Sequence, residues 1–271
     1  MELTEIDEII KIEIINNNEK NKKLELISIF YKSDDIIVQG YILKKKELTK
    51  KVPVIIYCRG GNRSYGEVSI KSQIYRKEFI SLVENEKSII FYPNYRGSSQ
   101  SQGNDEFGGH DVNDIISLYP IISKYKYCNK DKIALYGWSR GGTMAIKVST
   151  MVDWITTIIL GGTLFSMIKM MKERPEMAKL WLETFHLTKN DFKERAPKYL
   201  INKIPKHIPI LILHGSNDKR VSVEHCYLLG KKCQENNLLY KLIIFPNGDH
   251  GLTQYDDDVM TEIIKWIDKY L

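Results

Sequence analysis

The sequence predicts an α/β fold whose mostly parallel sheet is covered by helices on both faces. From about residue 53 onward, short apolar runs alternate with helical stretches of roughly 10–15 residues, the pattern of a parallel sheet with crossover helices. Two β-branched runs come earlier and are separated only by KSDD, which indicates an N-terminal antiparallel hairpin. A third feature is a segment at 162–206 without any strand pattern, which predicts a helical insertion.

The elements follow in order along the chain. The stretch up to Lys23 fits either a short helix with a loop or a strand at the sheet edge, and the sequence leaves both open. The hairpin is LELISIFY and IIVQGYIL, and the next strand, Pro53 to Cys58, ends at Arg59-Gly60-Gly61. Further strands are expected at 88–93, 132–137, 156–162, 209–215 and 239–245, with helices near 68–84, 112–125, 141–152, 223–236 and 257–271.

The insertion at 162–206 contains two or three amphipathic helices, broken near Pro175 and Pro197. An insertion after the carboxyl end of a strand lies over the ligand crevice of an open α/β sheet. We therefore expect one domain, 1–271, with an embedded helical cap at 162–206 that is a candidate lid. The alternative is that its Met, Trp and Phe side chains only form the buried faces of these helices.

Composition and charge limit the possible partners. The 271 residues are 43% hydrophobic and 27% charged, as in a soluble protein with a large core. Although the net charge is +6, basic and acidic residues alternate, and the densest basic cluster, Lys44 to Lys46 with Lys50 and Lys51, fits a solvated loop. We expect no nucleic-acid partner.

Apolar runs, the N-terminal charges and the cysteine spacing indicate the cellular compartment. No segment reaches the roughly 18 uninterrupted apolar residues of a membrane span, and the N-terminus carries acids where a signal peptide needs bases. Cys58, Cys128, Cys226 and Cys233 have neither disulfide-framework nor metal-site spacing. A cytoplasmic protein with reduced core cysteines, no metal and no cofactor is expected.

The motif Gly137-Trp138-Ser139-Arg140-Gly141 lies between an expected strand and an expected helix. A nucleophile elbow requires this context, because its tight turn needs glycine on both sides and presents the serine at a helix N-terminus. Ser139 is therefore the candidate nucleophile.

A serine nucleophile needs a histidine base and an acid that orients the histidine. Asp218 and His250 follow the candidate strands at 209–215 and 239–245, at the sheet edge that carries Ser139. Asp218 could instead cap the following helix, and Asp249 is a rival acid. His214 is interpreted as a partly buried structural histidine.

The oxyanion formed in such a reaction must be bound by two preorganised N–H donors. The backbone amide of Arg140 follows the serine and supplies one. The turn after the strand ending at Cys58 should supply the other, from Gly60 or Gly61.

The elbow GWSRGG, the segment FYPNYRGSSQSQGNDEFGGHDVNDI and the loops HGSNDKRV and GDHG together resemble the catalytic domain of the prolyl oligopeptidase family of serine peptidases. The resemblance extends from about Leu24 to the C-terminus and implies the α/β-hydrolase fold. It implies a triad of Ser139, Asp218 and His250, an oxyanion hole at Gly60 and Arg140, and a supporting loop at 94–97. The expected substrate contacts are Arg59, Gly61, Trp138 and Tyr95.

The chain departs from that family in two ways. Arg59 stands where many members have histidine, and 271 residues leave no room for the usual β-propeller. The predicted function is therefore broader: a serine hydrolase that cleaves an ester or peptide bond of a small substrate through an acyl-enzyme intermediate, as a monomer or homo-oligomer. The alternatives are a non-catalytic small-molecule binder and a lipid-surface lipase, the latter suggested by the Met-rich cap.

Overall fold

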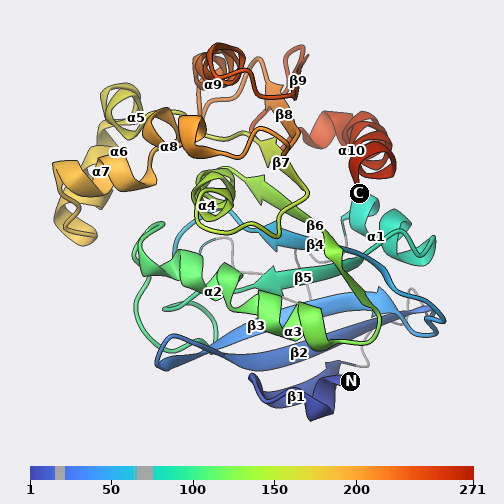
Figure 1. The fold of residues 1–271 in the computed structure, drawn as a ribbon. Coiled ribbons are helices and arrows are strands. Elements are labelled where there is room, and N and C mark those ends of the chain that lie inside the picture. The colour runs from blue at the N-terminus through green and yellow to red at the C-terminus, as the bar shows by residue number, and fades with distance from the viewer. Residues whose placement is uncertain (16–21, 64, 66–75) are drawn as a thin grey trace.

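The computed structural model describes residues 1–15, 22–63, 65 and 76–271. These residues form one nine-stranded sheet in the order β1-β2-β3-β5-β4-β6-β7-β8-β9 (Figure 1). The strands are β1 Ile9–Ile15, β2 Leu24–Ser33, β3 Ile36–Lys45, β4 Val52–Cys58, β5 Ile89–Pro93, β6 Cys128–Trp138, β7 Thr157–Gly161, β8 Ile210–Gly215 and β9 Tyr240–Phe245. The predicted α/β class with a mostly parallel sheet is confirmed.

The N-terminal part of the sheet is antiparallel. β1 pairs with β2, β2 with β3 and β3 with β5. The six strands β5, β4, β6, β7, β8 and β9 follow one another in the sheet and are parallel. The stretch before Lys23 that the sequence left open contains a 3-10 turn, Leu3–Glu5, followed by the edge strand β1.

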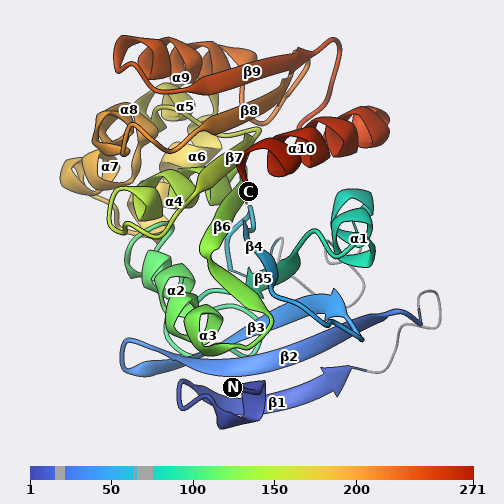
Figure 2. The ribbon, with the colours of Figure 1, turned by 45° about the vertical axis from the view of Figure 1, so that its right-hand side comes forward.

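Two layers of helices cover the parallel strands because successive side chains of a strand point to opposite faces. On β4, Val54 and Ile56 pack into one core with helices α2 Asn113–Ile116, α3 Leu118–Lys124, α4 Arg140–Ser149 and α9 Val223–Glu235. Ile55 and Tyr57 pack into the other core with α1 Lys77–Glu84 and α10 Asp256–Tyr270. Figure 2 shows α1 and α10 side by side on that second face.

Three helices differ from their predicted extents, and the one predicted at 141–152 is observed as α4 Arg140–Ser149. The helix predicted at 68–84 is seen from Lys77, and its part before Arg76 lies outside the described residues. The single helix predicted at 112–125 is divided into α2 and α3. Pro120 explains the division, because proline has no N–H to donate to the carbonyl of Ile116.

The segment between β7 and β8 is helical. It consists of α5 Met167–Glu173, α6 Pro175–Lys179, a π-helical turn Leu180–Thr184, α7 Lys189–Arg195, α8 Pro197–Leu200 and a 3-10 turn Ile201–Lys203. Pro175 and Pro197 occupy first-turn positions, where a missing N–H costs nothing. This cap has its own small core around Trp181, Met170 and Phe192, which also includes Phe107 from the body.

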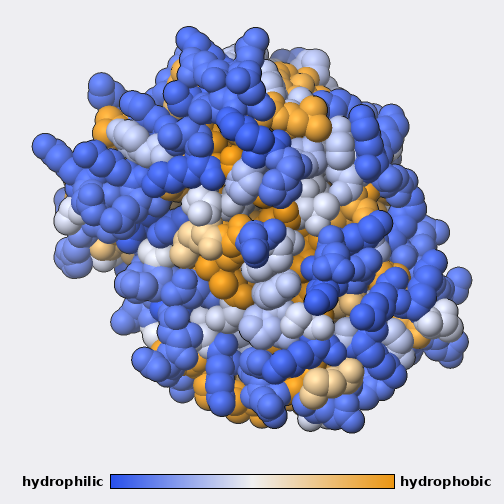
Figure 3. Space-filling model, in the orientation of Figure 1, coloured by the Kyte–Doolittle hydropathy of each residue, from blue (hydrophilic) through white to orange (hydrophobic). Residues whose placement is uncertain are grey.

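The outer surface of the cap is mainly polar. On the face seen in Figure 3, hydrophilic residues cover the cap at the upper left, and hydrophobic residues gather nearer the centre. In the described part of the chain, no helix combines the length and apolar character that crossing a membrane requires.

Candidate active site

Ser139 lies at the sharp turn between β6 and α4. Its φ of 56° and ψ of −122° fall in a region that non-glycine residues rarely occupy, at a cost of about 1–3 kcal/mol. A Cβ on Gly137 would lie 2.4 Å from the carbonyl oxygen of Gly141, and one on Gly141 would lie 1.8 Å from that of Cys58. The glycines of the motif are therefore required by close backbone packing, as the elbow hypothesis expected.

His250 is held from two sides. Its Nδ1 lies 2.7 Å from Oδ2 of Asp218, and its backbone carbonyl accepts a 2.9 Å hydrogen bond from Nε1 of Trp138. The other oxygen of Asp218, Oδ1, accepts from the backbone amides of Arg220 and Val221 at 2.8 and 2.9 Å. With Nδ1 bound to the carboxylate, Nε2 is the nitrogen left for chemistry in the pocket.

A second histidine contacts the same carboxylate. Nε2 of His214 lies 3.3 Å from Oδ2 of Asp218 and 2.8 Å from the carbonyl oxygen of Val221, and its side chain is buried. Burial raises the pKa of Asp218, but hydrogen bonds from His214 and His250 outweigh this and hold the pKa well below its usual range. Asp218 is therefore a stable anion behind His250.

His214 was expected to be only a structural histidine, and its contact with Asp218 was not predicted. The available signal was its position four residues before Asp218, at the end of the same strand.

Asp249, the rival acid, is bound within its own turn. Its Oδ1 accepts from the backbone amides of Gly251 and Thr253 at 3.1 and 3.2 Å, and its Oδ2 accepts from the Thr253 hydroxyl at 3.2 Å. The geometry therefore favours Asp218 as the partner of His250.

Ser139 and His250 both line a pocket of about 920 Å³ between the cap and the strand ends. The wall combines apolar side chains from the cap and body with several cations; it includes Phe107, Trp138, Leu164, Met170, Met177, Arg76, Arg174, Lys219 and Arg220. No cluster of three or more His, Cys, Asp or Glu side chains suited to a metal ion occurs within the described ranges.

The turn after β4 lies directly against the elbow. A Cβ on Gly60 would be 3.2 Å from Cβ of Ser139, so the backbone of this turn adjoins the serine. The guanidinium of Arg140 donates to the carbonyl of Gly61 at 3.0 Å and to Asp105 at 2.7 Å, and it also pairs with Asp111. Arg140 thus ties the elbow to the neighbouring turn.

The charge of Arg140 is compensated inside the protein. Burial lowers the pKa of Arg140, but the charges of Asp111 and Asp105 outweigh this and raise it. Burial likewise raises the pKa of Asp105, whereas Arg140 lowers it and the net shift is downward. Both groups of the Arg140–Asp105 pair are therefore charged.

Two of the expected substrate contacts are not in the pocket wall. Gly61 and Trp138 line the pocket, but Arg59 and Tyr95 are fully buried outside it. The guanidinium of Arg59 donates to the carbonyl of Asn94 at 2.9 Å and lies 4.9 Å from the ring centre of Tyr95. The expectation for Arg59 and Tyr95 is corrected accordingly: these side chains support the turn because the guanidinium is directed to backbone carbonyls inside the protein.

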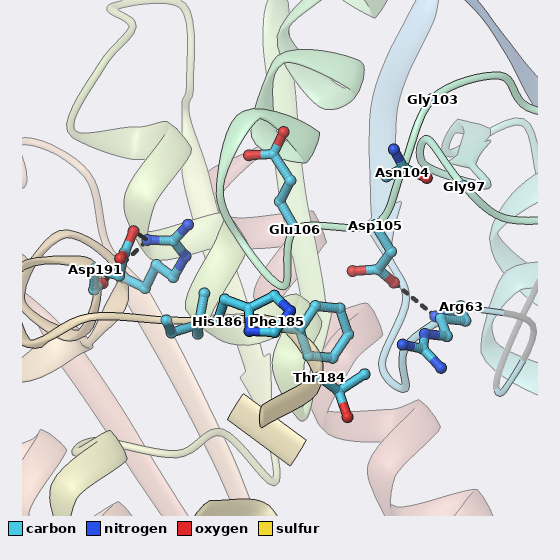
Figure 4. A pocket seen from close by; sticks show the side chains of 12 residues that line it. Arg63, Gly97, Gly103, Asn104, Asp105, Glu106, Thr184, Phe185, His186 and Asp191 are labelled. Atoms are coloured by element: carbon cyan, nitrogen blue, oxygen red, sulfur yellow. Dashed lines mark hydrogen bonds and ion pairs between the residues drawn. The ribbon is translucent and has the colours of Figure 1, made fainter. Parts of the chain in front are cut away.

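A second hollow of about 750 Å³ adjoins the first. Figure 4 shows Asp105 and Arg63 on one side of it, Asp191 on the other and Phe185 with His186 between them. The ring contact between Phe107 and Phe185 forms part of the boundary between the two hollows. Ser139 and His250 line only the first hollow.

The chain is similar in sequence to known proteins. The model of the prolyl oligopeptidase family matches residues 75–271. The chain is 28% identical over 220 residues to the uncharacterized peptidase YtmA of Bacillus subtilis, and the match covers 79% of this chain and 82% of YtmA.

Solved structures show the same fold. The uncomplexed acylaminoacyl peptidase of Pyrococcus horikoshii has a TM-score of 0.78 at 19% identity, covering 93% of this chain and 42% of that one. An acetyl xylan esterase from Paenibacillus sp. R4 has a TM-score of 0.71 at 12% identity, covering 96% and 88% of the two chains. The chain thus spans less than half of the archaeal peptidase but most of the esterase.

Proposed function

The chain belongs to the prolyl oligopeptidase family, a group within the α/β-hydrolase fold, and on that premise we propose that it is a serine hydrolase acting through an acyl-enzyme. The observation that carries the proposal is the hydrogen bond between His250 and the buried Asp218 beside a pocket that also contains Ser139. Family membership supports hydrolysis, and the pocket supports the assignment of individual residues.

In the proposed reaction, Oγ of Ser139 attacks the substrate carbonyl while Nε2 of His250 takes the hydroxyl proton. Asp218 keeps the proton of the imidazole on Nδ1 and stabilises the imidazolium that forms. The backbone amides of Gly60 and Arg140 bind the developing oxyanion. His250 then donates its proton to the leaving group, the C–O or C–N bond breaks, and Ser139 carries the acyl group. Water attacks this ester by the same path and restores the serine.

The proposed substrate is a small ester or a short peptide. The accessible pocket under the cap supports a small substrate. YtmA is named a peptidase and the Paenibacillus protein an esterase, so both bond types belong to the proposal. We place the reaction in the cytoplasm, which the four buried free cysteines support.

The test is covalent labelling by a fluorophosphonate probe. We expect wild-type protein to be labelled at Ser139 and Ser139→Ala to remain unlabelled. A panel of 4-nitrophenyl esters of increasing chain length, run beside aminoacyl anilides, then decides between ester and amide. Absence of both label and turnover would contradict the proposal and favour a non-catalytic binder. Activity that rises only above the micelle concentration of the substrate would favour a lipase.

A further inference from the structure

The pocket wall carries an excess of positive charge. Four cationic side chains line it besides the buried Arg140, namely Arg76, Arg174, Lys219 and Arg220, whereas Asp249 is the only acidic side chain in its wall among the described residues. Asp249 is bound to the backbone and hydroxyl of its own turn. Within the wall, cationic side chains therefore outnumber acidic ones.

Two of these cations are compensated. Nε of Arg76 pairs with the buried carboxylate of Glu78 at 2.5 Å, and its guanidinium lies 5.0 Å from the ring centre of Trp138. Nε of Arg174 pairs with Glu176 at 2.8 Å, and its Nη1 donates to the carbonyl of Arg220 at 3.2 Å. The charges of Arg76 and Arg174 are thus balanced by neighbouring carboxylates, and these side chains mainly form part of the pocket wall.

Lys219 and Arg220 differ from them. Among the described residues, neither forms an ion pair with a carboxylate within 4.0 Å, and both side chains are exposed at the pocket. The backbone of their loop is held in place, because the amides of Arg220 and Val221 donate to Asp218. The same short loop therefore carries the anion behind His250 and two cations that pair with no carboxylate of the described residues; the guanidinium of Arg220 lies 5.8 Å from the ring centre of Tyr65.

The rest of the pocket is suited to an apolar group. Phe107, Leu164, Met170 and Met177 line it, and the first three belong to the buried core shared by cap and body. A ligand that fits both the apolar part and the cationic part of the wall has an apolar group and a negative charge.

We propose that the pocket selects substrates that carry a carboxylate, with Lys219 and Arg220 as the residues that bind it. This inference rests on the proposed function, because it takes the bound molecule to be one that the protein hydrolyses. The binding test does not require hydrolysis. Peptides of a few residues with a free C-terminal carboxylate and an apolar side chain are the substrate class that fits. Two exposed cations near one carboxylate in a partly desolvated pocket give an expected preference of about tenfold in Kd.

The experiment measures binding to the Ser139→Ala protein by isothermal titration calorimetry, so that turnover plays no part. The ligands are acetyl-Gly-Phe with a free carboxylate and the same peptide as its C-terminal amide. We expect the free acid to bind about tenfold more tightly, and this ratio to fall as ionic strength rises. Adding Lys219→Gln and Arg220→Gln should bring the ratio close to one.

Lys231→Gln, which removes an exposed lysine of α9 outside the pocket, is the matched control and should leave the ratio unchanged. Equal Kd values for acid and amide, no binding of either peptide at millimolar concentration, or a ratio that survives loss of both cations would each overturn the inference. Should the double change prevent folding, Lys219→Gln alone and the salt dependence of the unmodified pocket decide. Equal Kd values for acid and amide in Ser139→Ala, together with intact fluorophosphonate labelling of the wild-type protein, would refute this inference and leave the proposed function standing.

Discussion

Nε1 of Trp138 donates a 2.9 Å hydrogen bond to the backbone carbonyl of His250, 112 residues further along the chain. Trp138 directly precedes Ser139, so this bond joins the serine turn to the histidine loop without any intermediate residue. The indole N–H of Trp138 therefore links the turn of the proposed nucleophile directly to the loop of the proposed base.

Trp138→Phe should test that dependence. Phenylalanine keeps an aromatic ring in the pocket wall but removes the N–H, and we expect kcat to fall about tenfold because a small displacement of the base is costly. Trp266→Phe is the matched control, since it removes a 2.8 Å hydrogen bond from Nε1 to the Thr157 hydroxyl away from the pocket. A similar loss of kcat in both variants would assign the effect to general stability.

Substitution of Asp218 and of Asp249 should show which of these two candidate acids orients His250. Ser139→Ala and His250→Ala are expected to abolish turnover. Asp218→Asn should cost less, although still about 10³-fold or more in kcat, because the amide can favour the wrong imidazole tautomer. Asp249→Asn should have a much smaller effect, and steady-state kinetics of the four variants measure the difference. Comparable losses for the two aspartates would show that Asp218 is the wrong acid.

The turn beside the serine should not tolerate a methyl group. In Gly60→Ala, the new Cβ would lie 3.0 Å from the Trp138 carbonyl oxygen and 3.2 Å from Cβ of Ser139, so the turn must shift. We expect kcat to fall by about tenfold to 100-fold as the oxyanion donor moves.

Gly40→Ala provides the control for this change. Its Cβ would lie 3.0 Å from the Tyr92 carbonyl oxygen, which is equally tight, but in β3 of the antiparallel part of the sheet. It should lower the melting temperature and leave kcat unchanged. Unchanged kcat in Gly60→Ala would argue against an oxyanion donor at that position.

A buried histidine should make cap attachment sensitive to pH. Nδ1 of His225 accepts a 2.8 Å hydrogen bond from the amide of Phe165, and Nε2 lies 3.0 Å from Glu173 of α5. Burial lowers the pKa of His225, although Glu173 opposes this. In the unfolded chain the pKa returns to about 6.5, so between the two values the unfolded state binds more protons.

The contribution of His225 to stability is therefore complete above about pH 6.5 and decreases as the pH falls below that value. We expect the melting temperature to drop as the pH falls from about 6.5 to 5.5, with a shallower drop in His225→Gln. His207→Gln removes an exposed histidine and should keep the wild-type slope. Identical slopes in all three proteins would rule out His225 as the titrating group.

Much of the candidate site could be predicted because parallel strands share one carboxyl edge. β6, β8 and β9 carry Ser139, Asp218 and His250 just after their last residues, and this follows from the apolar runs and turn residues alone. The close approach of Gly137 to the carbonyl of Gly141 is likewise local, whereas the packing of Gly141 against the carbonyl of Cys58 joins two distant segments.

Contacts between irregular loops could not be predicted in this way. Arg140 pairs with Asp105 and Asp111 across 35 and 29 residues, and no periodicity indicates such a pairing. The burial of Arg59 was not predicted for a related reason: arginine is usually exposed, and burial here depends on backbone carbonyls that include that of Asn94 in a separate loop.

β7 and β8 are hydrogen-bonded neighbours, with Gly161 opposite Leu213, although the entire cap lies between them in the chain. The pairing of β7 with β8 therefore fixes both ends of the cap. The conformation of the cap between them determines neither the strand order nor the strand register. Each doubling of such a loop costs only about 0.6 kcal/mol of closure entropy. Evolution can accordingly lengthen, shorten or replace the cap and so change which ligands fit the pocket. The sheet to which the cap is attached need not change.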